Sequence, residues 1–268
     1  MGVDVSLREQ LLEHLGGFRS APFLFAGAGL SRRYLGLESW AGLLRRFASE
    51  VGQPYEYYFA SANGDLPAVA SAIATDMHER WWNEDRYLES RNLFASAAVR
   101  RDSALKIEIA RYMASSIDRL PVQGPLATEI EKLRGIVVDG IVTTNYDPLL
   151  EKLFPDFRAF IGQDELLFSD PQGIGEIYKI HGSHDVPNSL VLTAEDYERF
   201  RDRNPYLAAK LLTIFVEHPV VFVGYSLADP NVIDIVVSIA VCLTTENIGK
   251  LQDRLVFVQW DPDATCRT

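Results

Sequence analysis

The stretch from Ile141 to Pro148 constrains the fold of this chain more than any other. It starts with apolar residues and ends with an amide, an aromatic ring and a carboxylate, in the order Ile-Val-Thr-Thr-Asn-Tyr-Asp-Pro. Asp147 is suited to cap a helix, and Pro148 to begin one, because proline is best tolerated at the first helical position. The stretch therefore predicts a strand, a polar turn and a helix. In an open α/β sheet, ligands bind at such turns.

The same order of strand, small or polar turn and helix recurs along the chain. The expected strands are Pro22–Ala26, Gly135–Thr143, Glu176–Ile180, Pro219–Val223 and Arg254–Trp260, and Phe157–Ile161 is a candidate for another. Continuous apolar strands indicate a parallel sheet that is covered by helices on both faces. Right-handed crossovers bring the turns to one edge of such a sheet. The sequence thus predicts an α/β fold.

Residues 52–134 differ in character from the rest of the chain. Their apolar residues have helical rather than strand spacing over three stretches, Leu66–Asn83, Tyr87–Ala98 and Ser103–Leu120. Pro54–Phe59 is aromatic and irregular, and outside this region a short strand is expected at Ser189–Leu192. We interpret 52–134 as a helical insertion in a domain formed by residues 1–51 and 135–268.

Composition narrows the classes of function. A net charge of −11 argues against direct nucleic-acid binding, which needs clustered Lys and Arg. Cys242 and Cys266 belong to no Cys-x-x-Cys pair, which excludes a four-cysteine zinc site and fits a reducing cytoplasm. Neither a signal peptide nor an apolar run of ~18 residues is present, so no membrane contact is expected. Only a short tail follows the last expected strand, so we expect the N-terminal part of a longer protein.

His181 is the strongest single candidate for a catalytic residue. A lone histidine is more often structural, but this one follows a strand, at the same predicted edge as Asn145 and Gly224. An imidazole with a pKa near working pH is a natural general base. His184 gives a His-x-x-His spacing, yet no third ligand is evident, so no metal is expected.

Two glycine turns are candidates for phosphate contact. The N–H groups of Gly27-Ala28-Gly29 suit a pyrophosphate at a helix start, but the same glycines equally suit a closely packed turn. Arg32 stands where a dinucleotide fingerprint has its third glycine. Gly224-Tyr225-Ser226 repeats the strand-then-turn order without the Gly-x-Ser-x-Gly elbow of a serine hydrolase.

Together the four strand ends resemble the sirtuin family and, more closely, the sirtuin-like domains of bacterial antiphage defence proteins. Gly27–Ser31 matches the phosphate loop Gly-Ala-Gly-x-Ser, and Thr143–Asp147 matches Thr-Gln-Asn-x-Asp with Thr144 in place of Gln. Lys179–Ser183 matches the His-Gly motif, and Gly224–Asp229 the Gly-x-Ser turn. Thr193–Phe200 is also typical of the defence group.

The resemblance implies a Rossmann-like sheet in which the helical insertion replaces the sirtuin zinc domain. Deacylating sirtuins carry two Cys-x-x-Cys pairs that this chain lacks. The expected activity is therefore that of an NAD glycohydrolase. It would cleave the nicotinamide–ribose bond of its substrate NAD to nicotinamide and ADP-ribose, and deplete NAD in antiphage defence.

The resemblance also implies roles for single residues. Asn145 and His181 are the catalytic candidates, Asn145 to orient water or hold the ribose and His181 to accept a proton. The candidates for NAD binding are Gly27, Ala28, Gly29, Ser31, Thr144, Asp147, Gly224 and Ser226. For Asp147, capping its own helix stays an alternative.

Two other functions stay open at this stage. One is a module that senses NAD or ADP-ribose without turnover, and the other is an NAD-dependent protein deacylase. A constitutive NAD hydrolase would kill its host, so we expect control by homo-oligomerisation or by a partner. A helicase-like ATPase, an Argonaute-type protein and a phage trigger are the partners considered.

Overall fold

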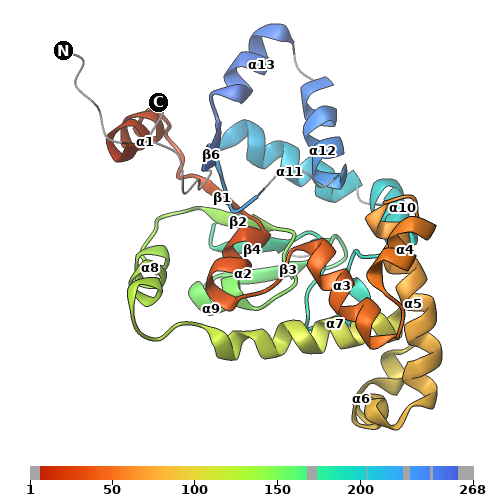
Figure 1. Ribbon diagram of the computed structural model, residues 1–268. Coiled ribbons are helices and arrows are strands. Elements are labelled where there is room, and N and C mark those ends of the chain that lie inside the picture. The colour runs from red at the N-terminus through yellow and green to blue at the C-terminus, as the bar shows by residue number, and fades with distance from the viewer. Residues whose placement is uncertain (1–6, 168–173, 204, 226–229, 242–243, 259–268) are drawn as a thin grey trace.

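A parallel sheet forms the centre of the protein in the computed structural model (Figure 1), which describes residues 7–167, 174–203, 205–225, 230–241 and 244–258. Its six strands are arranged in the order β3-β4-β2-β1-β5-β6. They are β1 Phe23–Ala26, β2 Gly140–Thr143, β3 Arg158–Ile161, β4 Glu176–Lys179, β5 Val220–Val223 and β6 Leu255–Val258. The predicted α/β, Rossmann-like class is confirmed.

The register of the sheet aligns the strand ends. Ala26 lies beside Thr143 and Val223, and Thr143 lies beside Lys179. The turns that follow β1, β2, β4 and β5 therefore start from one row at the carboxyl edge. This is the arrangement that the strand-and-turn pattern predicts.

Both faces of the sheet are buried, since successive strand residues point to opposite sides. Phe23 and Phe25 pack with α10 (Ala194–Arg203) and α11 (Pro205–Glu217). Leu24 and Ala26 pack with the layer on the other face, which includes α2 (Ala28–Leu35), α3 (Trp40–Glu50) and α9 (Leu149–Leu153). Each fully buried phenylalanine contributes about 1.5–3 kcal/mol. The sheet is thus the middle of three layers.

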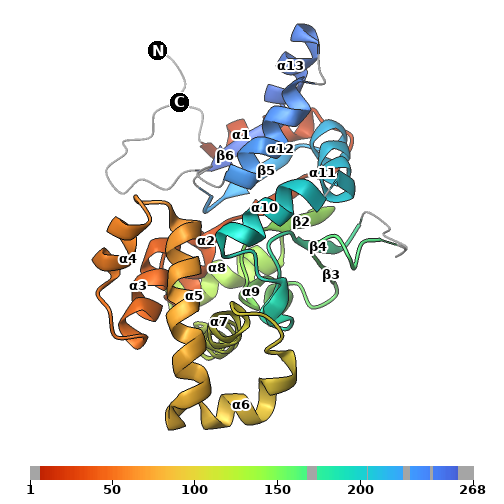
Figure 2. The ribbon, with the colours of Figure 1, turned by 90° about the vertical axis from the view of Figure 1, so that its right-hand side faces the viewer.

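A helical region extends from the layer on the second face (Figure 2). It contains α4 Tyr55–Ser61, α5 Leu66–Asn83, α6 Leu88–Phe94, α7 Ser103–Ser115 and α8 Pro125–Arg134. The long helix α5 coincides with its predicted range: Asp65 caps its start by accepting a hydrogen bond from the N–H of Ala68. Val69, Ile73 and Met77, spaced by four residues, are buried. The helices of residues 52–134 are confirmed, and their standing as a separate insertion stays a prediction.

Three predictions about local structure are wrong. Pro54–Phe59 is not irregular, because Pro54 starts α4 and the helical spacing of Tyr55 and Tyr58 buries both rings. The strand predicted from Gly135 begins only at Gly140. Ser189–Leu192 forms no strand: a 3₁₀ turn, η4 (Pro187–Ser189), precedes Leu190 and Leu192, which fill the core individually.

The remaining helices flank the sheet or its edge strand. They are α1 Leu7–Gly16, α12 Pro230–Val241 and α13 Thr245–Gln252, and α13 is a helix that the sequence pattern did not predict. Thr244 starts α13 by accepting a hydrogen bond from the N–H of Asn247. None of the helices in the described parts of the chain combines the length and apolarity that crossing a bilayer requires.

Candidate active site

The turn after β1 packs closely against the end of β5. The N–H of Gly27 donates to the carbonyl of Val223 at 2.9 Å, and the N–H of Gly29 to the carbonyl of Gly224 at 2.8 Å. A Cβ on Gly27 would lie 2.4 Å from the Gly224 oxygen, so no larger residue fits. The glycines thus serve close packing, and two of the N–H groups expected to face a pyrophosphate are engaged within the protein. Phosphate binding by this turn stays a prediction.

The turn after β2 joins the turn after β1 through three side chains. The amide of Asn145 donates from Nδ2 to the Gly27 carbonyl at 3.0 Å and to Oγ of Ser31 at 2.9 Å. Ser31 in turn donates from Oγ to Oδ2 of Asp147 at 2.7 Å. All three side chains are buried. This chain of hydrogen bonds, which we call the Asn145–Ser31–Asp147 cluster, fixes the orientation of the Asn145 amide.

Asp147 has a demonstrable structural role. Its Oδ1 accepts a hydrogen bond at 3.1 Å from the N–H of Leu149, the first residue of α9. The helix-capping alternative is therefore confirmed, although Pro148 precedes the helix rather than beginning it. With Oδ2 bonded to Ser31, both carboxylate oxygens have partners inside the protein. Contact of Asp147 with NAD stays a prediction.

Lys179, at the end of β4, supports the turn after β2. Its buried Nζ donates to the carbonyl of Asp147 at 2.8 Å and to that of Tyr146 at 3.3 Å. The ammonium also pairs with Glu151 Oε1 at 2.5 Å. Three acceptors on one buried ammonium hold the backbone beside Asn145 in place. The sequence identified Lys179 only as a strand residue of a motif.

His181 is buried and stands against an aromatic wall. Its ring meets Phe200 edge-on at 5.2 Å between centroids and Tyr197 at 5.9 Å. Trp40, at the start of α3, stacks on Tyr197 with 5.6 Å between centroids and 10° between planes. The carbonyl of His181 accepts a hydrogen bond from the N–H of Val191 at 2.9 Å. Ring and backbone of the histidine are both positioned by the segment that follows it.

These side chains surround one cavity of about 440 Å³ at the carboxyl edge of the sheet. Such a volume lies in the usual range for small-molecule sites, roughly 300–1,000 Å³. The predicted residues that line it are Ala28, Gly29, Ser31, Thr144, Asn145, Asp147, His181 and Gly224. Of the other two, Gly27 is bonded to Asn145 through its carbonyl, and Ser226 lies outside the described residues. The structure thus brings both catalytic candidates into one cavity.

Sequence reasoning missed part of the lining. Glu38, Trp40, Tyr197 and Tyr225 also face the cavity. Burial raises the pKa of Glu38, but hydrogen bonds from Tyr112 and Arg46 outweigh burial and hold that pKa below its ordinary value. Trp40 lies outside the motifs of the sequence analysis, at the start of α3. The position of Tyr197 in the motif-like stretch 193–200 was the available signal.

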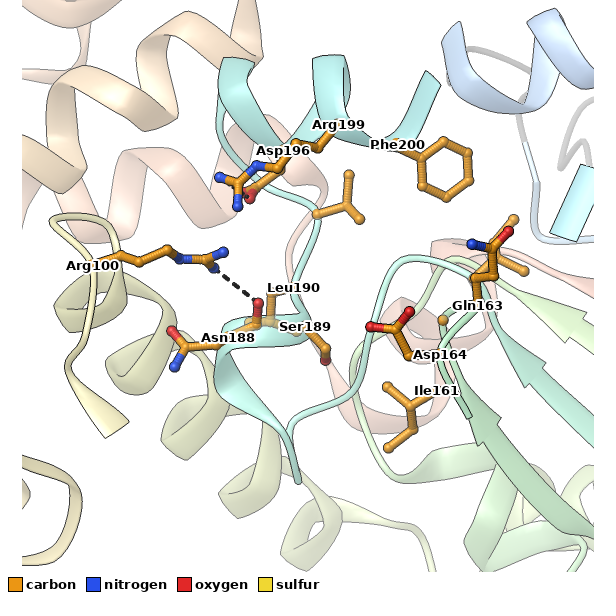
Figure 3. A pocket seen from close by; sticks show the side chains of 13 residues that line it. Arg100, Ile161, Gln163, Asp164, Asn188, Ser189, Leu190, Asp196, Arg199 and Phe200 are labelled. Atoms are coloured by element: carbon orange, nitrogen blue, oxygen red, sulfur yellow. Dashed lines mark hydrogen bonds and ion pairs between the residues drawn. The ribbon is translucent and has the colours of Figure 1, made fainter. Parts of the chain in front are cut away.

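A second cavity of about 320 Å³ lies behind α10 (Figure 3). Asp196, Arg199 and Phe200 line it from that helix, whereas Tyr197 faces the first cavity. Arg100 lies across this space from the loop that carries Asp164. Helix α10 therefore separates the two cavities.

His184 does not form a metal centre with its neighbours in the described structure. No group of three or more His, Cys, Asp or Glu side chains in the described ranges is arranged to hold a metal ion. Burial lowers the pKa of His184, and the nearby charge of Lys179 lowers it further, while Asp185 acts in the opposite direction. The backbone N–H of His184 donates to the Tyr146 carbonyl at 3.0 Å. His184 thus supports the turn that carries Asn145.

Comparison with protein families identifies the region that holds Asn145 and His181. The family model of the SIR2-like domain matches residues 139–267. Residues 139–267 are therefore similar to the SIR2-like domain. The resemblance predicted from the motifs is therefore confirmed.

The curated proteins similar to this chain carry two names. The chain is 27% identical over 212 residues to the NAD(+) hydrolase ThsA of Cytobacillus dafuensis, covering 78% of this chain and 36% of that protein. It is also 27% identical to the NAD(+) hydrolase ThsA of Bacillus cereus, with 78% and 37% covered. Defense-associated sirtuin 2 of Bacillus subtilis is 23% identical over 192 residues, covering 65% of this chain and 19% of that protein. The chain thus corresponds to well under half of each relative.

Proposed function

We propose that this chain is an NAD glycohydrolase. It cleaves the nicotinamide–ribose bond to give nicotinamide and ADP-ribose, and it depletes NAD in antiphage defence. The observation that carries the proposal is the single cavity that Asn145, Ser31, Asp147 and His181 share at the carboxyl edge of the sheet. The relatives named as NAD(+) hydrolases support the same substrate.

The proposed reaction needs few groups. Nicotinamide in NAD is a cationic leaving group, so the C1′–N bond can break without a general acid, and its electron pair stays on nicotinamide. Positive charge develops at C1′ of the ribose, as in other glycosidic cleavages. A water oxygen then bonds to C1′ and gives up one proton. Atoms and charge balance with water as the only co-reactant.

The cavity provides one group for each requirement. The Asn145 amide is held by two hydrogen bonds, so its Oδ1 is pre-oriented to accept one from water or from the ribose. The His181 imidazole would accept the proton of water or of a ribose hydroxyl. Trp40 and Tyr197 offer apolar ring surface to the substrate's rings. These roles follow from side-chain chemistry and position.

The test is hydrolysis of NAD by the activated protein, followed by chromatography of nicotinamide and ADP-ribose. We expect His181→Ala and Asn145→Ala each to lower kcat about 10²-fold or more, since a positioned proton acceptor contributes that much. The exposed His14, changed to alanine, is the matched control and should keep full activity. Intact NAD with activated wild type, or full activity in both site variants, contradicts the proposal.

The alternative functions give different results in the same series. Calorimetry that detects NAD or ADP-ribose binding without product would favour a sensing module. Release of acetate from an acetylated peptide would favour a deacylase. The proposed control by oligomerisation or by a partner is tested by measuring mass and NAD turnover together, with and without a candidate phage trigger.

A further inference from the structure

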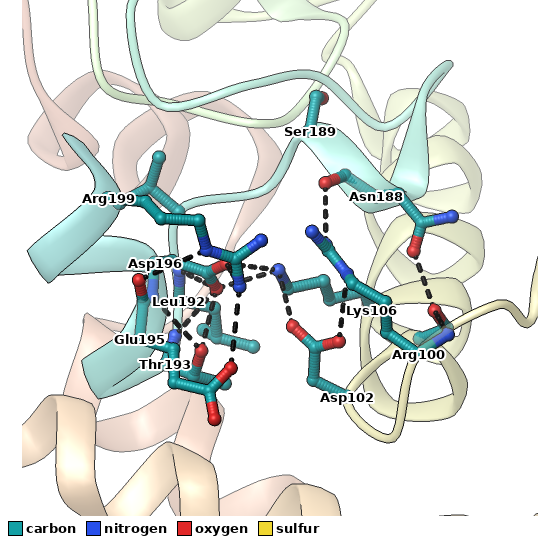
Figure 4. A network of polar contacts seen from close by, with 12 residues as sticks. Arg100, Asp102, Lys106, Asn188, Ser189, Leu192, Thr193, Glu195, Asp196 and Arg199 are labelled. Carbon is teal, nitrogen blue, oxygen red and sulfur yellow. Dashed lines mark hydrogen bonds and ion pairs between the residues drawn. The ribbon is translucent and has the colours of Figure 1, made fainter. Parts of the chain in front are cut away.

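A network of charges surrounds the buried Lys106 (Figure 4). Lys106, on α7, is fully buried, and its Nζ lies 2.7 Å from Oδ2 of Asp102 and 2.6 Å from Oδ2 of Asp196. Arg100 adds a contact to Asp102, and Arg199 a contact to Asp196. Positive and negative groups therefore alternate along the network. We call these five residues the Lys106 network.

Burial of such charges needs an explanation other than stability. Removing an ammonium and two carboxylates from water costs several kcal/mol for each ion, and apolar residues of the same volume are often as stable or more so. The best-attested gain from a buried ion pair is a fixed geometry. The question is which geometry Lys106 fixes.

Asp196 connects the network to the start of α10. Its Oδ2 accepts hydrogen bonds from the N–H of Leu192 at 3.1 Å, the N–H of Thr193 at 2.9 Å and the Thr193 hydroxyl at 2.9 Å. The Asp196 carboxylate therefore holds the residues that lead into α10 and bonds them to Lys106 on α7. Those contacts tie α10 to a helix that lies 90 residues away in sequence.

Helix α10 in turn positions the imidazole. Tyr197 directly follows Asp196, Phe200 lies one turn further on, and both rings meet the ring of His181 edge-on. The N–H of Val191, just before this helix, holds the carbonyl of His181. A shift of α10 relative to α7 would thus move the walls of the imidazole and one of its backbone anchors together.

A second set of hydrogen bonds, centred on Asn188, holds the other end of the same segment. Asn188 accepts a hydrogen bond from Ser103 at 2.8 Å and donates one to the Ala97 carbonyl at 2.7 Å. Arg100 donates to the Asn188 carbonyl at 2.9 Å. Residues 188–196 are therefore held at both ends by α7 and the loop before it.

We propose that Lys106 and Asp196 are positioning residues that hold the His181 imidazole in place through Tyr197 and Phe200. Neither residue is expected to touch substrate, because Lys106 is fully buried and does not line the first cavity. The helical region thereby sets the geometry of the sheet edge. Only the effect on NAD turnover rests on the proposed function.

The test uses the double variant Lys106→Met with Asp196→Asn. Methionine is unbranched and nearly as long as lysine, and asparagine can still accept from Thr193, so the start of α10 keeps its cap while its ionic tie to α7 is removed. Glu195→Gln, at an exposed carboxylate one residue earlier, is the matched control. Asp196→Asn alone, which leaves Lys106 paired with Asp102, serves if the double variant does not fold.

The primary readout is the His181 ring itself. The chain has five histidines, so ¹⁵N-histidine labelling gives a short spectrum in which His181→Ala assigns the signal. In the folded double variant we expect the ring signal of His181 to shift, while the ring signals of His14 and His78 stay unchanged. An unshifted His181 signal in the folded variant overturns the proposal.

Turnover provides the second readout. We expect kcat for NAD to fall about tenfold with KM changed less than about twofold, because misplacement of a catalytic group acts on the chemical step. A rise in KM without a fall in kcat would contradict the positioning of His181 by this network. If wild type does not hydrolyse NAD, the proposed function fails, but the NMR comparison still decides the positioning role.

Discussion

The Asn145–Ser31–Asp147 cluster and the Lys106 network are both polar and have buried side chains at their centres, yet they differ in what they can do. The first uses an amide, a hydroxyl and a carboxylate that all line the first cavity. The second uses ammonium, guanidinium and carboxylate groups and lies behind α10, away from that cavity. One cluster therefore offers groups to a ligand, and the other supports the groups that do.

Substitutions in the two clusters should also have different effects. Deleting the buried ammonium of Lys106 leaves its two carboxylate partners charged and without their shared counter-ion, which costs mainly stability. Deleting the Ser31 hydroxyl from the Asn145–Ser31–Asp147 cluster costs less stability, but it releases an amide that is proposed to act on substrate. Three predictions test this contrast.

The largest effect on stability is expected from Lys106→Met alone. The variant leaves the carboxylates of Asp102 and Asp196 buried without their shared ammonium, and we expect a loss of about 3–5 kcal/mol in unfolding free energy. Urea denaturation measures it. Lys152→Met, at an exposed site on α9, is the control and should change stability by less than about 0.5 kcal/mol. Equal midpoints for the two variants would refute a structural role for the buried charge.

Ser31→Ala should have an intermediate effect on stability. It removes the donor to Asp147 and the acceptor for Asn145, so we expect a loss of about 1–3 kcal/mol. Because the amide of Asn145 loses one of its two partners, turnover of NAD should fall more than stability alone explains. Ser49→Ala, on the exposed face of α3, controls for the substitution itself. Retention of wild-type kcat in Ser31→Ala would separate Asn145 from catalysis.

The smallest effect is a pH dependence that belongs to the Lys106 network. Burial raises the pKa of Asp196, but the charge of Lys106 and hydrogen bonds from Lys106, Thr193 and Leu192 outweigh burial and hold this pKa below its ordinary value. The resulting stabilisation is complete above the unfolded pKa of about 3.9 and is lost as pH falls through the lower folded pKa.

Unfolding free energies of wild type and Asp196→Asn measure that dependence. Their difference should be constant between pH 7 and about 5 and should shrink below about 4, where wild type loses the contribution. Glu195→Gln, with its side chain 82% exposed, should show no such trend. A difference that grows on acidification would mean that the carboxylate is not stabilised by Lys106.

The contrast between the clusters also explains what the sequence could predict. Asn145, His181 and the glycine turns stand directly after apolar strands, and a parallel sheet brings such positions to one edge by topology alone. Their meeting in one cavity is therefore predictable. Lys106 lies within a helix at an unremarkable spacing, and its partner Asp196 is 90 residues away, so no local pattern indicates the pair.

The same reasoning accounts for the errors in local structure. Strand and helix periods cannot be told apart over stretches as short as Ser189–Leu192, and the apolar residues there are buried by tertiary contacts rather than by pairing in the sheet. Tyr55 and Tyr58 likewise sit in a helix because packing against the long helix α5 overrides weak propensity. No local pattern indicates the role of Trp40, because its stacking on Tyr197 depends on a helix far along the chain.

The contact of Gly27 and Gly29 with Gly224 has a consequence for the order of events in the cell. It joins the first strand of the sheet to the fifth, and most of the chain lies between them. Synthesis proceeds from the N-terminus, so β1 and α2 leave the ribosome long before β5 does. Until then the first turn has no surface to close against. A nascent or truncated chain that stops before residue 224 therefore carries Asn145 and His181 without the complete wall of the first cavity around them.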